Sequence, residues 1–532
     1  MCGIVGAVGP RACEGLREAR AAIRPPRGSS RAIAGPLFMD GKSSYSLKHQ
    51  AVIMTVGHLI AYSGSLIAGM ILVRMLSVVE FGTFMQVKLI YTTAIAVLVF
   101  GLPTSLFYFI PQQRSEEVKR FVVQNFVLLL VIGMVAAGVL YACKAALAGF
   151  MHNSRLEELI GYVVLLSILG LLDEMTQPIL ITIGRADMVA KLNIAATCWL
   201  LAFVPIVLWQ GYGLEGLFAT TAVQYVIKLA MVGSYVLRFP GAIWPIRRFK
   251  EVMEQIRYAA PLGFSGVLQT IKPQVEQYMV SFWYPTDMFA IYARGAFNLP
   301  VTHFLVANVS NVLLPKFIQL WRAGQKQEMF GLWQTAMRKV SLLTLPVFVY
   351  FLLFSEEVIV VLFTEAYRES TIIFVIYLCS MPMELFWYTH VHQAIGATRH
   401  ILLVNIWSFL GAILLNFVFH SLFGFVGPAI AWVVTKFLIY TYQFVIIAKY
   451  FSVSFWQTFP WLHILKILGL CLISGAVVYP LKFTGLPLLI ILVLSAAIYG
   501  GVYLLVLRKF GYLSLGLKEM VKERFFLFSS KA

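Results

Sequence analysis

From Ala51 onward, the sequence alternates between apolar runs of about 20 residues and short polar breaks. An α-helix needs a run of this length to cross the hydrocarbon core of a bilayer. No water is available inside that core to satisfy backbone groups, so a crossing segment of this kind must be helical. The pattern therefore predicts about 14 transmembrane helices, at residues 51–73, 86–110, 120–142, 157–180, 188–209, 214–237, 259–283, 290–314, 336–363, 370–393, 401–421, 424–448, 461–480 and 485–507.

Composition narrows the class of protein. Of the 532 residues, 60% are hydrophobic and 12% are charged, whereas soluble domains carry about 25% charged residues. A soluble chain of this size needs a polar coat that this composition cannot supply, and the apolar content is far too high for disorder. We therefore expect an all-α polytopic membrane protein and exclude a water-soluble multidomain enzyme.

The net charge of +18 indicates membrane orientation rather than nucleic-acid binding. Most of the 42 Lys and Arg residues fall in every second polar break and in the two terminal segments. Loops on the cytoplasmic side of membrane proteins collect basic residues. The chain is therefore predicted to lie in a bacterial-type inner (plasma) membrane with both termini in the cytoplasm, and no nucleic-acid partner is expected.

A weak internal repeat, with an offset of about 211 residues, predicts the domain organisation. IGRADMVAKLNI (183–194) matches IGATRHILLVNI (395–406) at Ile, Gly, Asn and Ile, and a G-x-x-G pattern follows both. Because six predicted spans separate the copies, we expect two six-helix lobes related by an axis along the membrane normal. The predicted parts are a basic N-terminal segment (1–50), a first lobe (51–238), an amphipathic cytoplasmic linker (239–258) with an interfacial helix at 244–257, a second lobe (259–449), two additional helices (450–508) and a cytoplasmic tail (509–532).

The predicted span 259–283 carries a polar stripe. Intervals of four, three and four residues place four side chains on one helix face: Ser265, Gln269, Lys272 and Glu276. A charge at the centre of a bilayer costs about 2.5–3.5 kcal/mol even on mild insertion scales, so we expect this face to line a water-filled cavity. Lys272 and Glu276 are spaced to form an ion pair, and Pro273 between them can kink the helix.

Other polar residues in the spans are further candidates. The same cavity is expected to include Arg74, Lys228, Arg294 and Asn298. The carboxylates that could couple transport to an ion are Asp173, Glu174, Glu276 and Glu384. Three lysines are interpreted as residues that snorkel to the interface or form structural ion pairs: Lys88, Lys436 and Lys466.

No cofactor or metal is predicted. No group of His, Cys, Asp and Glu has the spacing of a metal site. The nearest match to a phosphate-binding loop, residues 35–43, is one residue too long and follows no strand. Transport would therefore not be powered by a built-in ATPase, and the sequence leaves open whether H⁺ or Na⁺ is a coupling ion.

Four segments carry a resemblance to a known family: RMLSVVEFGTF (74–84), GLPTSLFYFIP (101–111), DMFAIYARGAF (287–297) and LPVFVYFLLFSEEVIVVLFTEAYRES (345–370). In these segments and in its number of spans, the chain resembles the Wzx-type polysaccharide flippases of the multidrug/oligosaccharidyl-lipid/polysaccharide exporter superfamily. The resemblance covers residues 45–510. It implies two six-helix lobes around a cationic cavity, and transfer of polyprenyl-pyrophosphate-linked oligosaccharides from the inner to the outer leaflet for O-antigen or exopolysaccharide synthesis.

The resemblance also implies roles for individual residues. Arg74, Lys272 and Arg294 would bind the pyrophosphate through charge-assisted hydrogen bonds. Gln269 and Asn298 would contact the sugars. Glu276 stands where the family often carries Asp. The implied partners are the lipid-linked oligosaccharide, membrane lipids and the polysaccharide polymerase machinery.

Three other functions stay open at this point. An ion-coupled exporter of drugs or metabolites from the same superfamily would have a cavity dominated by carboxylates. A membrane polysaccharide polymerase or ligase would need a sizeable outer loop, which the predicted topology lacks.

The third alternative is an amidotransferase. MCGIVGAVG (1–9) resembles the start of class II glutamine amidotransferases, in which Cys2 would be the N-terminal nucleophile. That likeness ends within about ten residues. We therefore expect residues 1–38 to be a gene-fusion scar or a wrongly assigned start, ahead of a cytoplasmic leader that begins at Met39.

Overall fold

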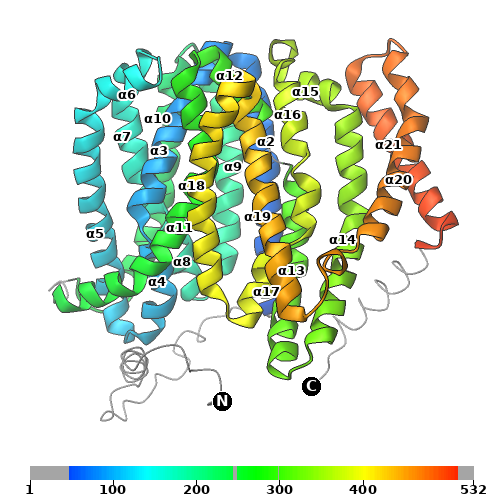
Figure 1. Cartoon of the computed structure of the whole chain (residues 1–532). Coiled ribbons are helices and arrows are strands. Elements are labelled where there is room, and N and C mark those ends of the chain that lie inside the picture. Colours follow the sequence, from blue (N-terminus) through cyan, green and yellow to red (C-terminus); the bar gives the residue numbers. More distant parts are fainter. Residues whose placement is uncertain (1–46, 244–248, 298, 513–532) are drawn as a thin grey trace. The chain divides into compact units, whose positions relative to one another are not determined.

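A computed structural model describes residues 47–243, 249–297 and 299–512 of the chain (Figure 1). Every regular element in these ranges is a helix. The α-helices are α2 (Leu47–Met75), α3 (Val78–Val99), α4 (Leu102–Phe109), α5 (Ser115–Ala142), α6 (Lys144–Phe150), α7 (Arg155–Asp173), α8 (Thr176–Thr182), α9 (Ala186–Trp209), α10 (Gly213–Leu237), α11 (Phe249–Trp283), α12 (Thr286–Gly295), α13 (Pro300–Arg322), α14 (Lys326–Leu353), α15 (Ser355–Phe363), α16 (Ser370–Leu378), α17 (Tyr388–Ile395), α18 (Thr398–Phe423), α19 (Gly427–Phe451), α20 (Trp461–Val478) and α21 (Leu488–Lys509).

The all-α polytopic fold expected from the sequence is confirmed. Within the described ranges, ten helices are long and apolar enough to cross a membrane, and shorter apolar helices accompany them. Short 3₁₀ turns join several of the helices, including η2 (Glu365–Tyr367), η3 (Met381–Leu385) and η5 (Phe455–Gln457).

Several predicted spans are divided into two helices. Residues 86–110 break between α3 and α4 at Phe100 and Gly101, whose φ angles are 34° and 74°. Pro103 is the second residue of α4, where its missing N–H costs nothing because that group has no partner in a helix. A Cβ on Gly101 would lie 2.6 Å from the carbonyl oxygen of Ala259. The break therefore lets the junction of α3 and α4 pack directly against α11.

Other predicted spans break in the same way, into α7 and α8, α12 and α13, α14 and α15, and α16 and α17. Apolar runs do not indicate such breaks, because both halves remain apolar.

Two groups of helices meet along α3, α11 and α12. In the first group, α2 lies along α9, both α3 and α5 pack on α7, and α10 contacts α7 and α9. In the second group, α11 and α19 pack on α18, α13 packs on α14 and α17, and α20 packs between α14 and α21. Contacts of α3 with α11 and α12, and of α4 with α11, join the groups. The residue boundaries of the two lobes stay predictions.

Hydrogen bonds reinforce the contact between α3 and α11. Gln86 Nε2 donates to Ser281 Oγ at 2.8 Å, and Thr93 Oγ1 donates to Gln274 Oε1 at 2.6 Å. Gln86 is fully buried, and its side chain also accepts from Asn153 at 2.7 Å. Buried polar groups are costly to leave without partners, so these bonds fix the register between the two helices.

Two pairs of glycines repeat along the chain at the offset of the sequence repeat. Gly184 and Gly396 have φ angles of 79° and 81°, and they precede α9 and α18. Gly213 and Gly424 have φ angles of 54° and 58°. Glycine adopts this left-handed conformation without the steric penalty of other residues. The repeated glycines therefore mark equivalent turns in the two halves of the sequence.

The predicted interfacial helix is not a separate element. α11 begins at Phe249 and continues without interruption to Trp283, with Pro261 and Pro273 inside it. Its first turns run at a steep angle to the rest (Figure 1). Two helices were predicted from the sequence where the chain forms one. A proline bends a helix without ending it when neighbouring helices support the bend.

Some predicted parts lie outside the described residues. They are the N-terminal segment through residue 46, with Cys2, the start of the linker helix (244–248) and the tail from residue 513.

Candidate functional site

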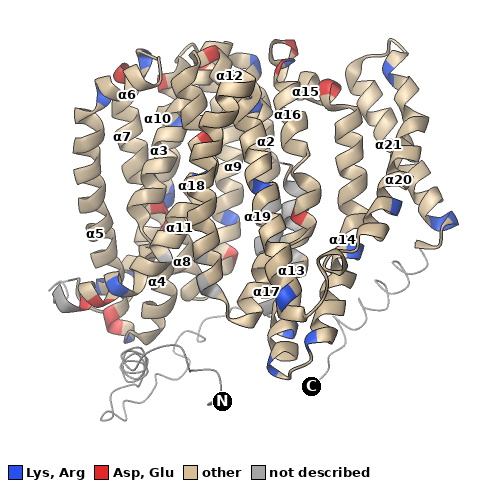
Figure 2. Cartoon of the chain, in the orientation of Figure 1, with Lys and Arg blue, Asp and Glu red and all other residues tan. Residues whose placement is uncertain are grey.

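Charged residues lie mainly near the ends of the helices, and a few lie midway along them (Figure 2). Charges away from the membrane surface are costly and usually functional. The residues of this smaller set define the candidate site.

Arg294, near the end of α12, has a guanidinium held between two aromatic rings. Its guanidinium carbon lies 4.1 Å from the ring centre of Phe81 on α3 and 5.0 Å from that of Phe363 on α15. A Cβ on Gly69 of α2 would lie 3.2 Å from the guanidinium, so the glycine makes room for it. Its Nε has no hydrogen-bond partner, and no carboxylate in the described part of the chain pairs with Arg294.

Tyr367 is a neighbour of Arg294 but cannot neutralise it. Tyr367 belongs to η2, in the loop between α15 and α16, and is 1% exposed. Burial raises the pKa of its hydroxyl to about 12, although the nearby Arg294 charge opposes this shift. The hydroxyl therefore stays neutral at physiological pH, and Arg294 gains no counterion from it.

Lys88, on α3, is a second cation without a partner in the described ranges. Its position is about 15 Å along the helix axis from either end of α3, too far for a lysine to reach the interface. The side chain is accessible to water, yet it lies deep within the protein and is repelled by the charge of Arg294. Lys88 is therefore not placed to snorkel to either end of α3, which corrects that interpretation.

The polar stripe on α11 faces the second group of helices. Glu276 is 3% exposed, and its Oε1 accepts a hydrogen bond from Tyr377 of α16. Its Oε2 has no partner, and the ion pair expected with Lys272 is not formed. Lys272 is half-buried, and no described carboxylate pairs with it. Lys436 of α19 repels Lys272 and attracts Glu276, so both face α19.

Ser265 and Gln269 complete the predicted stripe. Ser265 is half-buried and Gln269 is exposed, on the same helix as Lys272. Another polar candidate for the predicted cavity, Asn298, lies outside the described residues.

Two of the four candidate coupling carboxylates, Asp173 and Glu384, are paired with lysines. Lys228 Nζ lies 2.7 Å from Asp173 Oδ2, and both side chains are largely buried. Lys436 Nζ lies 3.1 Å from Glu384 Oε1. The structural ion pair expected for Lys436 is therefore present, whereas Lys228 contacts a carboxylate rather than standing free in a cavity.

Glu174 differs from the two paired carboxylates. It is exposed, no basic residue of the described chain pairs with it, and it lines two neighbouring pockets of about 230 and 390 Å³. Thr104 lines both as well. The smaller pocket includes the pair of Asp173 and Lys228, so these residues form a separate polar region among α4, α7, α9 and α10.

Arg74, at the end of α2, bridges the two groups of helices. It donates from Nη1 to the carbonyl oxygen of Leu362 at 2.8 Å and from Nη2 to that of Val361 at 2.5 Å. These carbonyls belong to the last turn of α15, which has no following N–H groups to satisfy them and carries partial negative charge. In this conformation the guanidinium of Arg74 is engaged by the backbone of α15.

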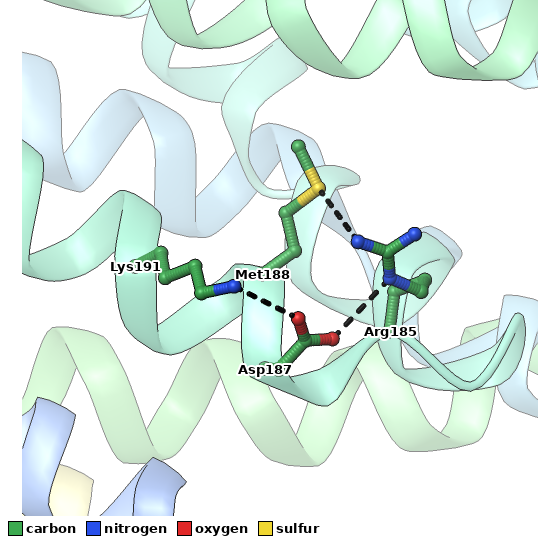
Figure 3. A network of polar contacts seen from close by, with 4 residues as sticks. All are labelled: Arg185, Asp187, Met188 and Lys191. Atoms are coloured by element: carbon green, nitrogen blue, oxygen red, sulfur yellow. Dashed lines mark hydrogen bonds and ion pairs between the residues drawn. The ribbon is translucent and has the colours of Figure 1, made fainter. Parts of the chain in front are cut away.

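The turn from α8 into α9 carries an ionic network at its surface (Figure 3). Asp187 accepts from Arg185 Nε and from Lys191 Nζ, each at 3.3 Å. Burial lowers the pKa of Arg185, but its hydrogen bond with Tyr235 and the charge of Asp187 outweigh this and leave it raised. An aspartate in the first turn also favours the helix dipole, so this network stabilises the start of α9.

The structure thus brings some of the predicted site residues together and separates others. Arg294 lies close enough to Lys88 to repel it, and Lys272 and Glu276 both interact with the charge of Lys436 on α19. Lys228, Asp173 and Glu174 form another region, and Arg74 contacts α15. Sequence analysis undervalued Lys88, although its distance from both polar breaks was a usable signal.

Comparison with known proteins places this arrangement in a family. The family described as "Polysaccharide biosynthesis protein" matches residues 71–372, a range that includes Lys88, Lys272 and Arg294. The chain belongs to this family. No curated protein matches the sequence.

Solved structures show the fold of this polysaccharide biosynthesis protein. It is similar to "Lipid II flippase MurJ, inward closed conformation", with a TM-score of 0.68 at 15% identity over 87% of this chain and 100% of that one. It is also similar to an inward-facing multidrug resistance MATE transporter of the MOP superfamily, with a TM-score of 0.61 at 16% identity over 76% of this chain and 98% of the other. An outward-facing MATE transporter gives a TM-score of 0.52 at 15% identity over 76% and 96%. The chain therefore has the MOP transporter fold.

Proposed function

We propose that this protein is a flippase, and not an enzyme, that moves polyprenyl-pyrophosphate-linked oligosaccharide units from the inner to the outer leaflet. The two lobes would rock about a central cleft between them in alternating access. The prenyl chain would stay in lipid throughout. The product would serve surface polysaccharide synthesis, O-antigen or exopolysaccharide, at a bacterial-type inner membrane beside the polymerase machinery. The observation that carries the proposal is the set of basic residues without negative partners in the described chain: Arg294, Lys88 and Lys272.

The physical argument starts from the cost of these charges. A buried charge without a partner is strongly destabilising, and Arg294 and Lys88 also repel each other. A diphosphate offers two negative charges and several acceptor oxygens, and a guanidinium binds such groups in a bidentate manner. Binding an anionic head would relieve the repulsion. The free energy recovered in this way would contribute to the affinity for the substrate.

The same charges argue against an exporter of cationic drugs. Such a protein would present free carboxylates, but Asp173 and Glu384 are paired with lysines and Glu276 is hydrogen-bonded to Tyr377. Only Glu174, among the described candidate carboxylates, faces a pocket without an ion pair. If transport is coupled to H⁺ or Na⁺, Glu174 is the first residue to test, and Glu174→Gln should then abolish the response to an ion gradient while leaving substrate binding intact.

The deciding experiment uses the full chain in lipid vesicles with a polyprenyl-diphosphate-linked sugar as probe. Arg294→Ala and Lys88→Ala should each lower the flipping rate at least tenfold, and Lys272→Ala should lower it as well. Lys144→Ala is the matched control, since it also removes one positive charge but from an exposed pair with Glu157 (3.1 Å).

Full flipping activity in both Arg294→Ala and Lys88→Ala, at normal protein levels, would show that these residues do not form an anion-binding site. Transport of a cationic dye with no effect of these substitutions would favour the drug exporter instead.

A further inference from the structure

A third pocket, of about 610 Å³, opens between α14, the turn after α19 and the start of α20. It is not lined by Arg294, Lys88 or Lys272. Three residues of α14 line this pocket: Phe330, Gln334 and Arg338. They recur every four residues and so share one helix face. Its volume is in the range of small-molecule binding sites.

Contacts around the pocket hold its walls in place. Gln334 Nε2 donates to the carbonyl oxygen of Gln457 in η5 at 2.5 Å. A ring nitrogen of His463 lies 3.3 Å from the carbonyl oxygen of Arg338, and the rings of Phe459 and Trp461 are 4.8 Å apart. The pocket is therefore formed before any ligand arrives.

The pocket is electropositive. Arg338 and His463 line the pocket, and the charges of Arg338 and Lys466 both act on His463, so two cationic side chains lie close to it. Over the residues that the structure describes, neither Arg338 nor Lys466 pairs with a carboxylate. The first turn of α20 lines the pocket with Trp461, Leu462 and His463, and its N-cap residue, Pro460, supplies no capping side chain.

The pocket also lies at a boundary between water and hydrocarbon. Arg338 stands where α14 turns from polar residues to the apolar stretch that begins at Val340. Trp456 is 72% exposed and Leu462 is 68% exposed. Tryptophans favour the headgroup level of a bilayer, and an exposed leucine on α20 offers a surface for a hydrocarbon chain.

We propose that this pocket binds an anionic phospholipid from the leaflet at which α19 ends and α20 begins. Arg338 and Lys466 contact the phosphate, Trp456 lies at the glycerol level, and one acyl chain lies along the apolar face of α20 past Leu462. Basic pockets between transmembrane helices recognise lipid phosphates in this way. The proposal is independent of what the protein transports.

Native mass spectrometry of the purified full chain tests the proposal, with phosphatidylglycerol and phosphatidylcholine of identical acyl chains as probes. Phosphatidylglycerol should bind more tightly than phosphatidylcholine. Arg338→Gln and Lys466→Gln should each weaken phosphatidylglycerol binding about fivefold and weaken phosphatidylcholine binding by less, because the choline group already cancels the charge of its phosphate. Arg338→Lys should retain most of the affinity. Arg238→Gln, at the end of α10 and outside the pocket, is the matched control and should change nothing.

Equal binding of the two lipids, or the same loss in Arg238→Gln, would overturn the proposal. Glycerol phosphate bound as tightly as the lipid would also overturn it, because the acyl chain would then contribute nothing. Should Arg338→Gln fail to fold, Trp456→Ala gives a second variant, since removing that exposed ring should weaken both lipids without changing the preference for negative charge.

Discussion

The side chain of Arg294 is fixed by its shape as well as by its charge. A planar guanidinium fits between the rings of Phe81 and Phe363, and both rings attract a cation through their faces. Its Nε is buried and has no hydrogen-bond partner. The stacking orients the cation without consuming its hydrogen-bonding capacity.

Arg294→Lys tests this arrangement. Lysine keeps the positive charge but cannot stack as a plane or bind a diphosphate in a bidentate manner. We expect flipping of the lipid-linked probe to fall about tenfold, equivalent to about 1.4 kcal/mol, with the melting temperature of the purified protein little changed. Unchanged flipping in Arg294→Lys would mean that charge alone suffices and that the stacking has no role in transport.

Sequence patterns could indicate which individual residues belong to the site only in part. The stripe of Lys272 and Glu276 follows from helical spacing, and their common face toward α19 agrees with it. The absence of an ion pair between them does not follow, because Tyr377 and Lys436 come from helices distant in the sequence. Lys88 and Arg294 meet for the same reason, through the contact of α3 with α12.

Close approach of backbones determines how the helices pack around the site. At the junction of α3 and α4, a Cβ on Gly263 of α11 would lie 2.4 Å from the carbonyl oxygen of Phe100. No side chain fits there. The helices and their order could be predicted from apolar runs alone, but this junction could not, because it depends on left-handed backbone at Phe100 and Gly101 and on a partner helix far along the chain.

Gly263→Ala should therefore destabilise the protein. The added methyl group meets backbone that cannot rotate away, and overpacking of this kind costs about 1–3 kcal/mol. Thermal unfolding of the purified protein measures the loss. Gly266→Ala, one turn further along α11, is the control, because nothing lies within 4 Å of the added atom. Equal melting temperatures for the two variants would contradict the packing described for the junction.

The two groups of helices are joined at one end by Arg74 and at other points by α3 and α11. The bonds from Arg74 to the last turn of α15 link α2 of the first group to the second. Outward opening would require these bonds to break.

Loss of the Arg74 bonds should favour the outward-open form. We expect Arg74→Ala to increase, several-fold, the rate at which a cysteine introduced as Leu362→Cys reacts with a maleimide that cannot cross the membrane. Mass spectrometry of the labelled peptide separates this site from the native cysteines. Arg368→Ala is the control, since Arg368 pairs with Glu356 at 3.3 Å in the same region but contacts nothing on α2. The same labelling rate with and without Arg74 would show that these bonds do not hold the outer side closed.

In the proposed transport cycle, the cations without partners would make the protein sensitive to the membrane potential. When the site is empty, Arg294, Lys88 and Lys272 are positive charges within the membrane that no described carboxylate cancels. Moving one such charge across the full field is worth about 2.3 kcal/mol per 100 mV. A potential negative in the cytoplasm would draw the empty protein back toward its inward-facing form. A bound diphosphate would cancel most of this charge, so the voltage would drive the return of the empty flippase rather than the outward step of the loaded one.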